Sequence, residues 1–187
     1  MTLPPLPAIG DPIDSPFTSA VNAFNLLLFG FQLDEAASAG RITPATFVER
    51  LRVHTGGPGV EINKRYTQEQ VAILAEQARL AALAVCVQAF DRALDETFGA
   101  KQPDDLGELS SARTIIFQVR NCFAHNPFAP TWQIHARYRR LITVPTVGVQ
   151  LDGAARDGQP FTPDHVGGWE GLLKLLVFCS KQIAEQS

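Results

Sequence analysis

Three side chains suited to phosphate chemistry lie close together in the second half of the chain: Arg120, Asn121 and His125. The Arg guanidinium keeps its positive charge and can bind phosphate oxygens through two parallel hydrogen bonds. The His imidazole titrates near neutral pH and can therefore accept or donate a proton. Hydrophobic residues flank the three within the run TIIFQVRNCFAHNPFAPTW. This combination predicts a site that binds a phosphate and transfers a proton.

Cleavage of RNA without a metal ion uses these two kinds of group. A base takes the proton from the 2′-hydroxyl, and a cation stabilises the charge that builds on the phosphoryl oxygens. His125 suits the first role, or it protonates the leaving 5′-oxygen instead, and Arg120 suits the second. Asn121 is expected to hold His125 or to hydrogen-bond a phosphate or sugar. The alternative is structural, because Arg and His both stabilise the C-terminus of a helix.

The segment RNCFAH, residues 120–125, resembles the Arg-x4-6-His signature of the HEPN superfamily. Members of that family are compact helical bundles, and many are metal-independent endoribonucleases. The resemblance implies that Arg120 and His125 are the catalytic pair and that pairs from two protomers face each other across the axis of a homodimer. It also implies a toxin or defence role, RNA as the substrate and an antitoxin-like protein partner.

The chain departs from the pattern of one branch of that family. Members regulated by a nucleotidyltransferase partner often carry a Tyr two residues after the His, and this chain has Pro127 there. A partner of that kind is therefore not expected to act at this position. The second function that the resemblance implies is a catalytically inactive module that binds a nucleotide, RNA or a protein.

Positive charge gathers around the Arg/His motif. The net charge of the chain is −3, yet no Asp or Glu occurs between Glu108 and Asp152. This distribution predicts an anionic ligand, and the alternative is a solvated face that lacks acids. Trp132 is expected to stack on a base, or to be a core residue under its loop, and His135 to assist. The expected RNA-binding arginines are Arg113, Arg137, Arg139 and Arg140.

Hydrophobic periodicity and capping residues predict the elements that position these groups. The chain has 187 residues, of which 45% are hydrophobic, which is enough for one buried core. We expect an extended Pro-rich arm over residues 1–14 and a single HEPN-like helical domain over residues 15–187. Cap and stop signals and apolar stripes indicate five helices. The helices are expected over residues 15–39, 43–55, 67–98 and 104–126, and from Trp169 onward.

Two short runs rich in β-branched residues, 141–144 and 147–151, predict a small β-hairpin. The predicted fold class is therefore all-α: a bundle of about five helices with a small β-hairpin before the last helix. On an ideal helix His125 shares a face with Asn121, whereas Arg120 lies about 140° away. Arg120 and His125 can meet only if the last turn frays or if they come from different subunits.

The cysteines indicate neither a disulfide framework nor a zinc site. Cys86, Cys122 and Cys179 are widely spaced in apolar contexts, which favours reduced core thiols and the cytoplasm. The Pro-rich N-terminus lacks the basic region of a signal peptide. The longest unbroken apolar run, residues 80–87, is too short to span a bilayer. No metal, cofactor or membrane is expected.

Overall fold

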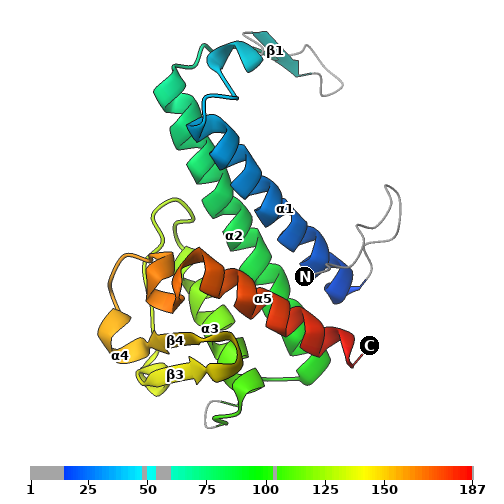
Figure 1. The fold of residues 1–187 in the computed structure, drawn as a ribbon, viewed down its shortest axis with the longest axis vertical. Coiled ribbons are helices and arrows are strands. Elements are labelled where there is room, and N and C mark those ends of the chain that lie inside the picture. The colour runs from blue at the N-terminus through cyan, green and yellow to red at the C-terminus, as the bar shows by residue number, and fades with distance from the viewer. Residues whose placement is uncertain (1–14, 48–49, 54–59, 103–104, 187) are drawn as a thin grey trace. The chain divides into compact units, whose positions relative to one another are not determined.

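The computed structural model describes residues 15–47, 50–53, 60–102 and 105–186. Helices dominate these residues, and a two-stranded hairpin precedes the last helix, which confirms the predicted fold class (Figure 1). The expected N-terminal arm and the loop at Gly56–Gly59 lie outside the described residues. The helices are α1 (Pro16–Ser38), α2 (Gln68–Phe98), α3 (Glu108–Phe123), α4 (Gly153–Arg156) and α5 (Gly168–Ala184). The strands are β1 (Arg50–Val53), β2 (Val60–Asn63), β3 (Leu141–Val144) and β4 (Val149–Asp152).

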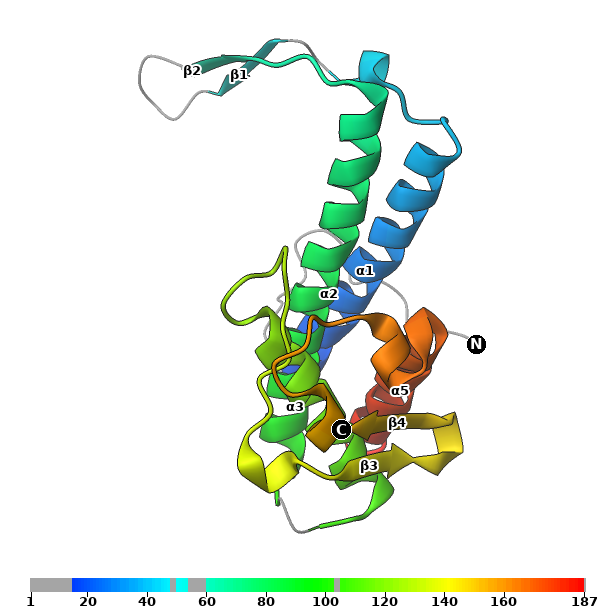
Figure 2. The same cartoon turned by 90° about the vertical axis from the view of Figure 1, so that its left-hand side faces the viewer.

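The described chain forms two compact units, one of residues 15–27 with 81–186 and the other of residues 28–80. In the first unit α3 packs against β3 and α5 (Figure 2). The pairing of β3 with β4 is antiparallel, and side chains alternate between buried and exposed along both strands. The hairpin therefore covers the helices with one apolar face. The buried residues of that face are Ile142, Val144, Val149 and Leu151.

The second unit is built from the C-terminal part of α1 and the N-terminal part of α2. Ala37, Val71 and Ala75 form its small buried cluster. An ion pair of 2.7 Å joins Arg79 Nη1 to Asp34 Oδ2 beside that cluster. That residues 15–187 form a single domain stays a prediction.

The helix predicted over residues 43–55 does not form, so this part of the prediction was wrong. A short 3-10 turn, Pro44–Thr46, is followed by β1, which pairs antiparallel with β2. The segment is short and contains Thr, Phe and Val, which favour a strand once a partner strand is near. A brief isolated helix gains little from its own hydrogen bonds. The pairing of residues 50–53 with residues 60–63 therefore forms in place of the helix.

The ends of α2 match the predicted signals. The backbone N–H of Thr67 donates to Gln70 Oε1 at 3.1 Å, and the N–H of Gln70 donates to Thr67 Oγ1 at 3.2 Å. Gly99 follows the helix with a φ of +74°, a left-handed conformation that Gly adopts at little cost. Among the described helices α2 alone is long and apolar enough to cross a membrane, by length and composition only. Core helices of water-soluble proteins pass the same test, so the expected absence of a membrane stays a prediction.

The end of α3 decides where the motif residues lie. The helix stops at Phe123 rather than at Asn126, because Asn126 Oδ1 accepts hydrogen bonds from the N–H groups of Phe128 and Ala129, at 3.0 and 3.2 Å. This side-chain-closed turn replaces the last helical turn that the sequence predicted. His125 therefore lies beyond the helix, and its predicted helical alignment with Asn121 was wrong.

Candidate functional site

Arg120 lies in the last turn of α3 with 42% of its side chain exposed. Its Nη1 donates a hydrogen bond of 3.2 Å to Asn121 Oδ1, and its Nε is 4.0 Å from Asp91 Oδ2 on α2. Asn121 thus holds Arg120, whereas the sequence suggested that it holds His125 or hydrogen-bonds a phosphate or sugar. Arg120 also lines a surface pocket of about 270 Å³ between α2 and α3. The other lining residues are Ala84, Gln88, Phe123 and Ala124.

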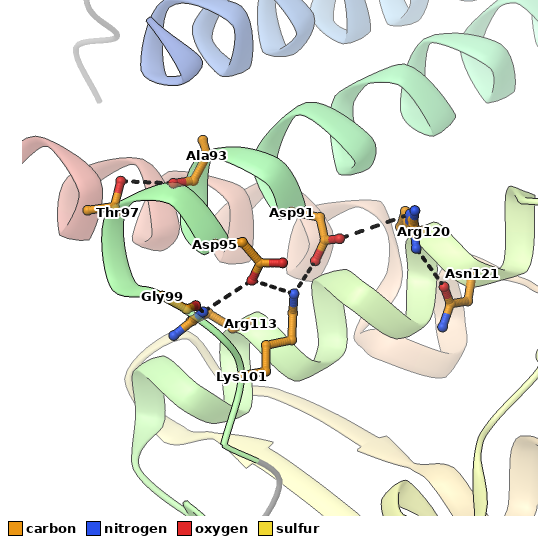
Figure 3. Close-up of polar contacts among 9 residues, drawn as sticks. All are labelled: Asp91, Ala93, Asp95, Thr97, Gly99, Lys101, Arg113, Arg120 and Asn121. Carbon is orange, nitrogen blue, oxygen red and sulfur yellow. Dashed lines mark hydrogen bonds and ion pairs between the residues drawn. The ribbon is translucent and has the colours of Figure 1, made fainter.

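The carboxylate beside Arg120 belongs to a buried charge cluster (Figure 3). Asp91 is 8% exposed, and its Oδ1 is 2.7 Å from Lys101 Nζ. The same Nζ is 2.6 Å from Asp95 Oδ1. Lys101 pairs with both carboxylates at close range, and Arg120 contributes only the longest contact of the cluster. Its half-exposed guanidinium keeps donors available for an anionic ligand.

Arg113 lies two turns earlier on α3 and is 7% exposed. Its Nη2 is 3.1 Å from Asp95 Oδ1 and also donates to the carbonyl oxygen of Gly99 at the C-terminus of α2. The side chain joins α3 to the end of α2 and offers almost no surface to a phosphate. This burial argues against the predicted RNA contact of Arg113.

His125 is exposed, and its side chain makes no hydrogen bond or ion pair with any residue in the described ranges. It does not line the pocket that contains Arg120. The imidazole is therefore free to approach a ligand or a second protomer. Within one chain, however, His125 and Arg120 do not line the same pocket.

A second, larger pocket of about 690 Å³ gathers several of the predicted residues, Asn121 among them. Asn121 and Phe117 of α3 form one wall, and the segment 131–139 forms the opposite one. His135, Arg137 and Arg139 belong to that segment. Arg140 does not line this pocket: it is half-buried, and its carbonyl oxygen accepts the N–H of Gly153 at 3.0 Å.

Hydrogen bonds fix the wall formed by residues 131–139. The N–H of Trp132 donates to the Gln159 carbonyl at 2.9 Å, and the Trp132 carbonyl accepts the N–H of Gly158 at 2.9 Å. Asp157 Oδ1 accepts the N–H of Ile134 at 2.8 Å, and Asp157 Oδ2 pairs with Arg139. The backbone hydrogen bond from Ile134, followed by the charge of Arg139, lowers the pKa of Asp157. Asp157 was missed in the sequence because its partners lie far away along the chain.

Trp132 reaches this pocket only at its edge, because the residue is fully buried. Its Nε1 donates a 2.9 Å hydrogen bond to His165 Nδ1, and its ring packs against Phe161 at a centroid distance of 5.3 Å. This burial argues against the predicted stacking of Trp132 on a base and favours the core alternative. Desolvation, followed by the charge of Arg156, lowers the pKa of His165, which the sequence left without a partner.

The three cysteines are buried and unpaired, as predicted. Burial raises the pKa of each thiol, to about 12 for Cys179. Within the described part of the chain, no group of three His, Cys, Asp or Glu side chains is arranged to hold a metal ion.

Comparison of the chain with protein-family models, with curated proteins and with solved structures gives no match.

Proposed function

We propose that the protein is a HEPN-like, metal-independent endoribonuclease that acts as a homodimer, with Arg120 and His125 as its catalytic pair. The observation that carries the proposal is the state of these two side chains at the end of α3. Arg120 is oriented by Asn121 and Asp91 yet half-exposed, and His125 is exposed and without a partner among the described residues. A structural pair at a helix end would instead hydrogen-bond the last carbonyl groups.

The two groups divide the chemistry of RNA cleavage between them. His125 takes the proton of the attacking 2′-hydroxyl or protonates the leaving 5′-oxygen. Arg120 binds the phosphoryl oxygens and stabilises the negative charge that they gain in the transition state. Asn121 Oδ1 accepts a hydrogen bond from Arg120 and so limits the orientations of the guanidinium before the substrate arrives.

A homodimer supplies what one protomer lacks. Arg120 opens into a pocket against α2, whereas His125 lies past the helix end and outside that pocket. In a two-fold assembly, Arg120 of one protomer and His125 of the other can line a shared cleft. A toxin or defence role and an antitoxin-like partner belong to the same proposal and rest on the resemblance alone.

The second candidate function is a binding module without catalysis. One observation favours it: the larger pocket gathers Asn121, Arg137 and Arg139 without His125. A protein that only binds nucleotide or RNA needs these groups and no titrating base.

Cleavage of single-stranded RNA in EDTA distinguishes the two functions. We expect the wild type to cleave and the variants Arg120→Ala and His125→Ala to lose about a hundredfold or more of the rate, because each removes a group used in the transition state. Arg92→Ala is the matched control, since Arg92 is an exposed arginine that pairs with Glu96 on α2. It should cleave at the wild-type rate.

Circular dichroism and sedimentation keep folding and dimer formation under control in these measurements. If the wild type is folded and dimeric but leaves RNA intact, the proposed ribonuclease is wrong and the binding module becomes the proposed function. Equal cleavage by the wild type and both variants would assign the activity to a contaminating nuclease.

A further inference from the structure

The larger pocket places two arginines and an asparagine amide beside one aspartate. Two arginines and one aspartate give its lining a net charge of +1 while His135 is neutral. The aspartate, Asp157, is occupied by the backbone N–H of Ile134 and by Arg139. The groups that remain for a ligand include cationic and amide donors, which suit an anion.

Arg137 is the free cation of this set. Its side chain is exposed and makes no hydrogen bond or ion pair with any residue that the structure describes. Its guanidinium carbon lies 4.8 Å from the ring centroid of Tyr138, which is 1% exposed. The buried ring thus orients the guanidinium and leaves its five N–H groups to a ligand.

Asn121 connects this pocket to Arg120. Its Oδ1 accepts from Arg120 Nη1, and the same residue lines the larger pocket, so its Nδ2 is left to donate to a ligand. A chain of phosphates that places one phosphate at Arg120 can therefore pass over Asn121 to reach Arg137. The volume of about 690 Å³ admits a nucleotide unit.

We propose that the pocket lined by Asn121, His135, Arg137 and Arg139 is a phosphate-binding subsite, which in the proposed ribonuclease holds the RNA backbone beside the phosphate being cleaved. This inference deepens the proposed function and rests on it for the identity of the strand. A free nucleotide offers the same phosphate chemistry, and the experiment separates the two sources.

The test uses binding without cleavage. The probe is a fluorescent single-stranded oligonucleotide with 2′-O-methyl groups, which cannot be cleaved because it lacks the attacking hydroxyl. Its affinity for the protein is measured by anisotropy in EDTA at several KCl concentrations. For Arg137→Gln we expect about tenfold weaker binding, because a charged hydrogen bond is lost. The slope of log affinity against log salt should fall by about 0.7, which corresponds to one phosphate contact with a single strand.

Arg92→Gln is the matched control, because it removes the same charge from an exposed arginine outside the pocket. Its affinity and salt slope should equal those of the wild type. Arg137→Lys keeps the charge without the planar fork, so it should restore the salt slope but not the full affinity. Identical binding curves for wild type and Arg137→Gln, with both proteins folded, would overturn the inference.

Two further comparisons separate the subsite from the proposed function and from a free nucleotide. If the protein cleaves RNA but binding of the probe does not depend on Arg137, the subsite is wrong and the proposed ribonuclease stands. If binding depends on Arg137 but RNA is not cleaved, the subsite stands and the proposed ribonuclease is wrong. If binding depends on Arg137 and the oligonucleotide binds more tightly than AMP, the ligand is the RNA backbone. If the oligonucleotide and AMP bind equally well, the ligand is a free nucleotide.

Discussion

Arg113 and Arg120 carry the same charge on the same helix, but Arg113 is buried in ionic and hydrogen-bonding contacts whereas Arg120 is half-exposed. The side chain of Arg113 is 8% exposed and that of Arg120 is 42% exposed. The difference arises because the carbonyl of Gly99 and the carboxylate of Asp95 meet α3 at Arg113, where they take up its donors. No pattern within α3 separates the two arginines, since their partners belong to the end of another helix.

At the same scale, the Trp132–His165 hydrogen bond makes the stability of the protein depend on pH. His165 Nδ1 can accept from the indole N–H only while it is unprotonated. Desolvation lowers the pKa of His165, so the folded state binds fewer protons there than the unfolded state does. This contribution to stability is complete above the ordinary His pKa of about 6.5 and is lost as the pH falls below it.

We therefore expect the urea midpoint of the wild type to fall between pH 7.5 and pH 5.5 by more than that of His165→Gln, over a range set by the ordinary His pKa of about 6.5. Gln retains an oxygen that accepts the indole N–H but does not titrate. Subtracting the change in urea midpoint of His165→Gln from that of the wild type removes the effect of the other titrating groups. Parallel pH profiles for the two would contradict the role assigned to His165.

At the scale of elements, the junction of β4 with α4 holds one wall of the larger pocket. Gly153 is buried at this junction, and a Cβ placed on it would lie 2.2 Å from the carbonyl oxygen of Tyr138. That carbonyl belongs to the turn that carries Arg137. Because the obstacle is backbone, the turn must move as a unit to admit a side chain.

We expect Gly153→Ala to lower the free energy of unfolding by about 1–3 kcal/mol, as overpacking does elsewhere, and to weaken binding of the 2′-O-methyl oligonucleotide. The measurements are urea unfolding and anisotropy. Ala154→Ser, at the exposed next position of α4, is the control and should leave binding unchanged. Wild-type stability and affinity in Gly153→Ala would show that the turn does not depend on this close packing.

At the scale of the whole molecule, the proposed shared cleft predicts complementation between inactive subunits. When Arg120→Ala and His125→Ala proteins are mixed and allowed to exchange subunits, each mixed dimer contains one cleft with an intact Arg and an intact His. Random exchange should restore about a quarter of the wild-type activity, because half of the dimers are mixed and each has one working cleft. Differently tagged subunits report the exchange, and mixed dimers without activity would contradict a pair drawn from two protomers.

Signals that act over a few residues determined much of the fold. The caps at Ser15 and Thr67, the stop at Gly99 and the β-branched runs within residues 141–151 predicted α1, α2 and the second hairpin, since each depends on nearby backbone hydrogen bonds or on the residue types of one element. The motif residues were proposed from their chemistry and from the family resemblance, and their roles stay predictions. Tertiary structure alone decided the strand β1, the burial of Arg113 and Trp132, and the gathering of Asn121 with Arg137 and Asp157. These features depend on partners that are distant along the chain, and a local pattern carries no record of such contacts.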